Sequence, residues 1–162
     1  MLNQKLQRKI DLLLTTMLGV GKLKPAPGTY GSILALIILS IPPAYIVVTN
    51  IILCIILVLS YFAIKRVEGE FGFDPDFIVV DEFIAMSFIY SSRLIADDIF
   101  ISLLALFLFR FFDILKPFPI NLLNNRNGSF YVIADDILAA IFTVISIKLI
   151  IFIQNLIFIA KI

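Results

Sequence analysis

Two pairs of adjacent carboxylates embedded in apolar sequence are the strongest candidates for chemistry in this chain. Asp81-Glu82 and Asp135-Asp136 each have apolar residues on both sides. Adjacent acids in such surroundings repel each other and resist desolvation unless a cation neutralises them. Oxygen-rich clusters suit hard ions such as Mg²⁺, which binds through a few carboxylates, waters and substrate phosphate. The alternative is that each pair marks the start of a helix, where the macrodipole favours acids.

A second motif places cations beside a further acid. Arg110, Asp113 and Lys116 follow one another at intervals of three residues, so on a helix they share one broad face. Pro117 and Pro119 would then end that helix. Arginine offers phosphate a bidentate fork and lysine a compact charge, so this motif fits a phosphate site near a metal cluster. A local Arg110–Asp113 ion pair, with Lys116 reaching the membrane interface, explains the same residues without a ligand.

The stretch from Lys24 to Ser32 could contribute backbone donors to the same site. Gly28 and Gly31 allow close approach of the backbone, and Thr29 or Ser32 could cap the helix that follows. Exposed N–H groups at a helix start attract anions. A plain turn with an N-cap is the alternative interpretation.

The residues that the chain lacks narrow the chemistry. There is no histidine, which excludes imidazole as nucleophile, base or zinc ligand. The one cysteine, Cys54, lies in an apolar run without the basic neighbours that a reactive thiolate needs. A formal net charge of +1 gives no reason to expect nucleic acid as a partner. Carboxylates, Lys, Arg and hydroxyls must therefore carry the chemistry, and a turn at Asp74-Pro-Asp76 could hold Asp74 near them.

The composition indicates where these residues are held. Hydrophobic residues make up 61% of the 162 residues and charged residues only 15%, and the mean hydropathy is +1.08. In a typical soluble domain, nearer half of the residues are hydrophobic and about a quarter are charged. So much apolar surface cannot be buried inside so small a globule, which predicts an integral membrane protein. Without an internal repeat or linker, residues 1–162 are expected to form a single domain.

Helices spanning the membrane must then position the charged motifs. The N-terminal stretch predicts a basic amphipathic helix on the membrane surface. The chain is uncharged from Pro25 to Ile64, which as helix would run about 60 Å and could cross the membrane twice. Pro42-Pro43 provides the break between a first arm at Ser32–Ile41, which could begin earlier, and a second at Ala44–Ile64.

The rest of the chain alternates between charged and apolar segments. Lys65–Glu82 is rich in charge and punctuated by Gly and Pro, which predicts a loop. Neither half of Phe83–Phe109 reaches the usual span length, so a helical hairpin is the simplest solution. Ile137–Ala160 is the final apolar segment. The tip of the hairpin would carry three charges, Arg93, Asp97 and Asp98.

The positions of the basic residues orient this arrangement. If the apolar pieces are two hairpins and a final span, nearly all Lys and Arg outside the hairpin tip fall on one side, which the positive-inside rule makes cytoplasmic. The Gly28–Ser32 loop and both acidic pairs meet at that face, together with Arg110–Lys116. The expected fold is therefore all-α, a multi-pass integral membrane protein with an N-terminal interfacial helix and hairpin-like membrane segments.

Four motifs, taken in order, resemble those of the phosphatidylglycerophosphatase A family. They are Pro27-Gly-Thr-Tyr-Gly-Ser32, Val80-Asp-Glu-Phe83, Phe109-Arg-Phe-Phe-Asp-Ile-Leu-Lys-Pro-Phe-Pro-Ile120 and Asp135-Asp-Ile137. Four separate motifs in order are far more specific than any one of them. The resemblance covers about Leu18 to Ala140 and implies a bacterial inner-membrane enzyme with its site on the cytoplasmic face. Such an enzyme depends on Mg²⁺ and removes the terminal phosphate of phosphatidylglycerophosphate to give phosphatidylglycerol.

The residues and the resemblance agree on the site. Mg²⁺ would be held by a subset of the five acids, which are also the catalytic candidates: Asp81, Glu82, Asp113, Asp135 and Asp136. The substrate phosphate would be bound by Thr29, Ser32, Arg110 and Lys116. One acid could serve as base or as covalent nucleophile, because no other base is available. The sequence carries no signal for an oligomeric state.

A cation transporter or channel is the competing interpretation. Acids embedded in the membrane can bind a permeating ion as well as a catalytic one. Here the acids gather at one face instead of lining a pore, and cations lie among them. This distribution favours the lipid phosphatase.

Overall fold

The computed structural model describes residues 2–40, 46–92 and 98–160, and nearly every regular element in them is an α-helix. This confirms the all-α prediction. The elements are α1 (Leu2–Thr15), a short 3₁₀ turn η1 (Val20–Lys22), α2 (Pro27–Ser40), α3 (Ile46–Phe71), α4 (Val80–Ser91), α5 (Ile99–Leu115), α6 (Ile120–Asn124) and α7 (Ser129–Ile159).

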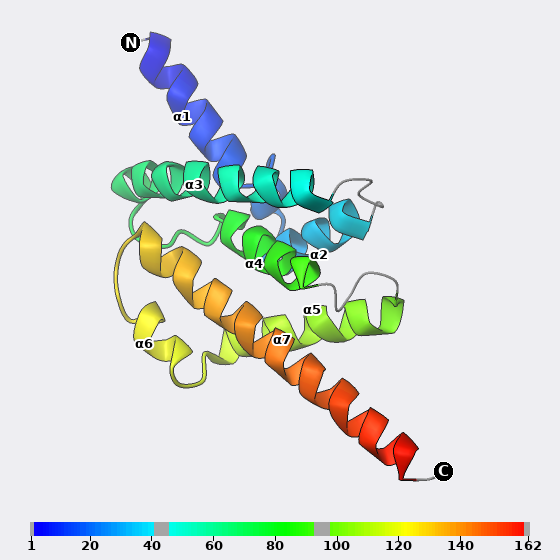
Figure 1. The fold of residues 1–162 in the computed structure, drawn as a ribbon. Coiled ribbons are helices and arrows are strands. Elements are labelled where there is room, and N and C mark those ends of the chain that lie inside the picture. Colours follow the sequence, from blue (N-terminus) through cyan, green and yellow to red (C-terminus); the bar gives the residue numbers. More distant parts are fainter. Residues whose placement is uncertain (1, 41–45, 93–97, 161–162) are drawn as a thin grey trace.

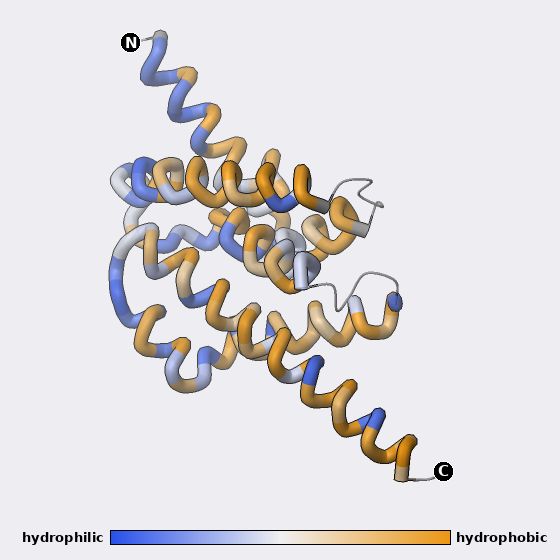
Figure 2. The backbone as a smooth tube through the Cα atoms, in the orientation of Figure 1, coloured by the Kyte–Doolittle hydropathy of each residue, from blue (hydrophilic) through white to orange (hydrophobic). Residues whose placement is uncertain are grey.

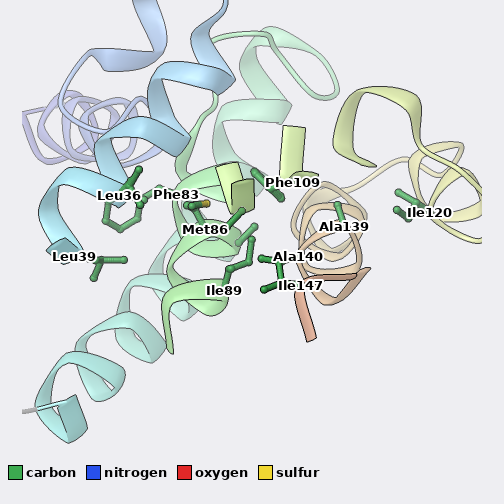
Figure 3. Close-up of a cluster of buried hydrophobic side chains, with 13 residues drawn as sticks. Leu36, Leu39, Phe83, Met86, Ile89, Phe109, Ile120, Ala139, Ala140 and Ile147 are labelled. Atoms are coloured by element: carbon green, nitrogen blue, oxygen red, sulfur yellow. The ribbon is translucent and has the colours of Figure 1, made fainter. Parts of the chain in front are cut away.

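Helix α4 forms the centre of the bundle, between α2 on one side and α7 on the other (Figure 1). Its side chains interdigitate with those of both neighbours in a core that includes Leu36, Met86 and Ala140 (Figure 3). Phe109 from α5 is fully buried in the same core. Small residues on α4 and α7, such as Ala85 and Ala140, allow these two helices to approach closely. The acidic pairs at their N-terminal ends are thereby brought together.

The apolar segment predicted as a hairpin forms two helices in the structure. They are α4 and α5, and Asp98 caps α5 by accepting hydrogen bonds from the backbone N–H of Phe100 (2.8 Å) and Ile101 (3.4 Å). The other two charges predicted for the tip of the hairpin, Arg93 and Asp97, lie outside the described residues, as does the break predicted at Pro42-Pro43.

The loop predicted over Lys65–Glu82 is wrong in its first third. Helix α3 continues through Lys65 to Phe71, and the loop occupies only the residues between it and α4. The charged end of α3 stays helical because it pairs with α1. Arg66 forms a two-pronged ion pair with Asp11 (2.7 and 2.8 Å), and Arg8 pairs with Glu70.

Two other helices begin earlier than the apolar segments from which they were predicted. Helix α2 starts at Pro27, a favourable first position for proline, and α7 starts at Ser129. The Asp135-Asp136 pair therefore lies in the second turn of α7, not in a loop before it. In contrast, Asp81-Glu82 lies in the first turn of α4, where the helix dipole favours acids.

Close backbone packing fixes the segment that enters α4. A Cβ on Gly21 would collide with the Phe77 carbonyl, and one on Gly31 would come within 2.9 Å of the Val79 side chain and carbonyl. The Val79 N–H also donates to the Thr15 carbonyl at 2.9 Å. The end of α1 and the start of α2 thus hold residues 77–79, which place the first turn of α4.

Large apolar side chains cover much of the outside of the molecule (Figure 2). Two helices are long and apolar enough to cross a bilayer, Val47–Phe71 and Ser129–Ile159, and in their most apolar windows only 17% and 28% of residues are buried. In Figure 2 the hydrophilic residues gather in α1 and in the loops that connect α3 to α4 and α6 to α7. These features agree with a membrane protein whose polar loops lie at one end.

We expect Asp11→Asn to lower the free energy of unfolding by about 1 kcal/mol at neutral pH. Burial alone would raise the pKa of the Asp11 carboxyl, but hydrogen bonds from Arg66 and Gln7 outweigh it and leave the pKa lowered. A lowered pKa stabilises the fold above the ordinary value near 3.8, and this contribution disappears as the pH falls through the folded-state pKa. Thermal unfolding of the wild type and the variant in detergent at pH 7 and pH 3 measures this contribution to stability.

The exposed Arg8–Glu70 pair supplies the control for this prediction. Both side chains are about half exposed, so Glu70→Gln should change stability very little. Equal losses in Asp11→Asn and Glu70→Gln, or an Asp11→Asn deficit that does not become smaller from pH 7 to pH 3, would contradict the assignment.

Candidate active site

A polar cavity of about 560 Å³ lies where the starts of α2, α4 and α7 meet the end of α5. Residues from all four sequence motifs reach it, as the sequence predicted. Its charged lining residues are Lys24, Asp74, Asp76, Asp81, Glu82, Asp113, Lys116, Asp135 and Asp136.

Three carboxylates in this cavity are arranged as a metal ion would require. One ligand oxygen from each of Asp81, Glu82 and Asp136 lies within 4.8 Å of the others. Asp81 and Asp136 are only 6% and 5% exposed. Glu82 Oε2 and Asp136 Oδ2 are buried and have no hydrogen-bond partner among the described residues. Buried carboxylate oxygens without a partner fit a hard cation with oxygen ligands, such as Mg²⁺.

The other two predicted acids each have a cation. Arg110 Nη1 lies 2.7 Å from Asp113 Oδ2 and 3.6 Å from Glu82 Oε1. Lys116 Nζ donates to Asp135 Oδ2 at 2.5 Å. The site therefore brings five acids together with two cations. The excess negative charge is concentrated on the three carboxylates described above.

Lys116 is held at the mouth of the cavity by the backbone. It ends α5 in a left-handed conformation (φ 43°), and its N–H donates to the Phe112 carbonyl. Besides Asp135, its ammonium donates to Asn124 Oδ1 at 2.5 Å. Lys116 therefore faces the acids instead of continuing along the helix, and its third N–H remains for a ligand.

The glycine of the first motif makes the closest contact with the site. A Cβ on Gly28 would collide with Glu82 Oε1 and lie 3.0 Å from both terminal nitrogens of Arg110. Gly28 is thus needed where α2 crosses the Glu82–Arg110 pair. The structure places Thr29 and Ser32 differently from the prediction: both lie inside α2, neither lines the cavity, and neither caps the helix. The Ser32 hydroxyl is fully buried and donates to the Gly28 carbonyl at 2.9 Å.

The turn at Asp74 does approach the site, as expected. Asp74 lines the cavity mouth in a left-handed conformation (φ 48°). Partial enclosure there raises the pKa of its carboxyl, and the positive charge of Lys116 opposes this rise.

One buried acid near the site escaped the sequence analysis. Glu68 is 8% exposed; it accepts hydrogen bonds from the Ser129 hydroxyl (3.0 Å) and, at 3.3 Å, from the Asp74 N–H. It therefore ties α3 to the start of α7 and to the turn. Because Ile64 and Glu68 are four residues apart, continuing the helical pattern past Ile64 would have placed Glu68 on the buried face.

We expect Gly28→Ala to lower catalytic activity by about tenfold to a hundredfold, because the new methyl group must displace Glu82 or Arg110. Initial rates of the phosphate release that the sequence resemblance implies, with circular dichroism to check the fold, measure this effect. Gly69→Ala is the matched control, since a Cβ there meets nothing within 4 Å in an exposed turn of α3. Equal rates in the Gly28→Ala variant and the wild type would contradict the tight contact.

Comparisons with known proteins agree with this geometry. The family model of phosphatidylglycerophosphatase A matches residues 13–151. A relative from Haemophilus influenzae named Phosphatidylglycerophosphatase A is 38% identical over 149 residues, covering 85% of this chain and 90% of the relative. A relative from Bacteroides thetaiotaomicron, named "Putative phosphatidylinositol-3-phosphatase", is 31% identical over 145 residues, covering 85% of this chain and 91% of the relative. No solved structure matches the chain.

The matched residues include every part of the acidic cavity, from Gly28 on α2 to Asp136 on α7. Both relatives carry the names of enzymes that remove phosphate from phospholipids. The chain belongs to the phosphatidylglycerophosphatase A family and is a lipid phosphatase.

Proposed function

We propose that this enzyme hydrolyses the terminal phosphate monoester of phosphatidylglycerophosphate, giving phosphatidylglycerol and inorganic phosphate, and that it requires Mg²⁺. One observation carries the proposal: three carboxylates converge, those of buried Asp81 and Asp136 and of partly buried Glu82, and Glu82 and Asp136 each have an oxygen without a partner among the described residues. The name of the Haemophilus influenzae relative points to the same substrate. The family assignment favours this phosphatase over a cation transporter.

Asp81, Glu82 and Asp136 would hold the metal. Mg²⁺ bound there supplies positive charge that the chain lacks, and so allows a phosphate dianion to approach a cavity rich in acids. The chain's own cations complete the binding of phosphate. Lys116 has an N–H left after its bonds to Asp135 and Asn124. Arg110, which is partly buried, keeps an Nε–H without a partner among the described residues.

The two acids that pair with these cations, Asp113 and Asp135, hold them in position instead of competing with the phosphate. Asp113 holds the Arg110 guanidinium beside the metal carboxylates, and Asp135 holds the Lys116 ammonium at the cavity mouth. Both cations are therefore oriented before substrate arrives, which strengthens their interaction with charge that develops during phosphoryl transfer. In a chain without histidine, the proton of the attacking water passes to a carboxylate of this cluster.

The apolar helices also support a proposal for the membrane placement. We infer that α3 and α7 cross the bilayer and that the cavity opens at the cytoplasmic face of a bacterial inner membrane. Helix α1 supports an interfacial position, since its pairing with α3 leaves Leu6, Ile10 and Leu13 exposed on one face. In a Cys54→Ser background, Asn125→Cys should react with an impermeant thiol reagent only in inside-out vesicles. Reaction from the outer side would reverse this orientation.

The decisive test is phosphate release from defined lipids by purified enzyme in detergent micelles. Phosphatidylglycerophosphate should be hydrolysed with Mg²⁺, and much faster than phosphatidylinositol 3-phosphate or phosphatidic acid. Faster hydrolysis of phosphatidylinositol 3-phosphate would assign the substrate named for the second relative. Cation flux in proteoliposomes without any phosphatase activity would overturn the proposal.

A further inference from the structure

The polar cavity contains one cation that the acidic cluster does not use. Its lining includes two lysines, Lys24 and Lys116. Lys116 is bound by Asp135 and Asn124, and Arg110 behind the lining is bound by Asp113. In the part of the chain that the structure describes, Lys24 makes no hydrogen bond or ion pair and its side chain is exposed.

The backbone around Lys24 is firmly positioned although its side chain is free. On its N-terminal side, Gly21 packs directly on the Phe77 carbonyl, and on its C-terminal side α2 begins at Pro27. Pro25 follows Lys24 immediately, so the dihedral freedom of both residues is restricted. Lys24 therefore offers an exposed positive charge from a fixed backbone segment in the lining of the cavity that also contains the acidic cluster.

The lipid expected here carries two phosphates, and this inference rests on the proposed function. The terminal monoester is the group that is cleaved, and a glycerol unit separates it from the phosphodiester that joins the diacylglycerol. With the monoester at the carboxylate cluster, the phosphodiester lies toward the rim of a cavity with seven acids in its lining. A second anion at that rim requires a cation without an acidic partner.

We propose that Lys24 forms a second phosphate subsite, which binds the phosphodiester of the lipid headgroup and distinguishes this substrate from lipids with a monoester alone. Lys24 takes no part in cleavage. Its charge holds a group that is unchanged by the reaction, so it should contribute equally to the ground state and the transition state. Loss of such uniform binding raises KM and leaves kcat alone.

Product inhibition can separate the two subsites. Phosphatidylglycerol keeps only the phosphodiester, whereas inorganic phosphate resembles only the group released. In Lys24→Met, we expect KM for phosphatidylglycerophosphate and the inhibition constant of phosphatidylglycerol each to rise about tenfold, with kcat unchanged, because one charge-assisted hydrogen bond is lost. The inhibition constant of inorganic phosphate should not change. Lys24→Arg should restore most of the affinity.

Lys22→Met is the matched control, because Lys22 is an equally exposed lysine two residues away that does not line the cavity. It removes the same charge from the membrane-facing surface, so a general loss of attraction to anionic micelles would affect both variants alike. Equal effects of Lys22→Met and Lys24→Met, a changed inhibition constant for inorganic phosphate, or an unchanged KM in Lys24→Met would overturn the subsite. A wild-type enzyme that is inactive on phosphatidylglycerophosphate would instead refute the proposed function, and the subsite with it.

Discussion

Asp136→Asn is expected to lower phosphate release from phosphatidylglycerophosphate by about 10³-fold or more while the helical fold remains intact. Asp136 is 5% exposed and its Oδ2 has no hydrogen-bond partner among the described residues. One of its oxygens lies within 4.8 Å of an oxygen of Asp81 and of one of Glu82. Asparagine keeps the size of the side chain but removes a negative charge, so the cluster can no longer hold a divalent cation tightly. Asp81→Asn should have the same effect.

The stability of the metal-free variant separates a functional acid from a structural one. A structural acid contributes to the fold, and its removal lowers the unfolding temperature. Asp136→Asn should instead unfold at a higher temperature than the wild type in EDTA, because it relieves repulsion among buried carboxylates. Glu70→Gln, which alters an acid far from the cavity, should keep full activity. An active Asp136→Asn enzyme, or an inactive one that is also less stable, would count against the metal cluster.

Removal of divalent cations should abolish the activity of the wild type, and added Mg²⁺ should restore it. The physical reason is the imbalance of charge, since Arg110 pairs with Glu82 and Asp113 and Lys116 pairs with Asp135, which leaves five clustered acids with two cations. A phosphate dianion cannot enter such a cavity without further positive charge. Initial rates after dialysis against EDTA, followed by titration with Mg²⁺, measure the effect.

Binding of Mg²⁺ should also be visible without any substrate. At about one hundred times its dissociation constant, the ion should stabilise the wild type by about 2.7 kcal/mol. The Asp136→Asn variant should show much less of this stabilisation. Full activity in EDTA would refute the metal requirement, and equal stabilisation of both proteins would place the ion elsewhere.

The sequence predicted the site better than it predicted the ends of the helices. Asp81, Glu82 and Asp136 stood out because acids are costly in apolar surroundings, and this cost does not depend on knowing the fold. The helical spacing of Arg110 and Asp113 also predicted their common face, whereas Lys116 reaches the site from the left-handed residue that ends α5. The convergence of these motifs followed from the hairpin arrangement, because helices of limited length must return to the face from which they started.

What the sequence could not show depends on contacts between distant residues. Helix α3 extends to Phe71 because Arg66 and Glu70 find partners on α1, 55 and 62 residues earlier in the chain. Without those partners, the same charges and Gly69 resemble a loop. Glu68 escaped notice for the same reason. Ser32 was predicted to bind phosphate, but its hydroxyl donates a hydrogen bond to the Gly28 carbonyl within its own helix. The composition does not reveal this alternative.

The two ion pairs between α1 and α3 run in opposite directions, and their order has a consequence for folding. Each helix contributes one arginine and one acid, Arg8 and Asp11 on α1, Arg66 and Glu70 on α3. If α1 slid by one turn, Arg8 would face Arg66, so the wrong register is repelled and the right one attracted. Because the Thr15 carbonyl at the end of α1 receives the Val79 N–H, that register also decides where α4 begins. The pattern of charges on α1 and α3 thus determines how the buried acids at the start of α4 are aligned.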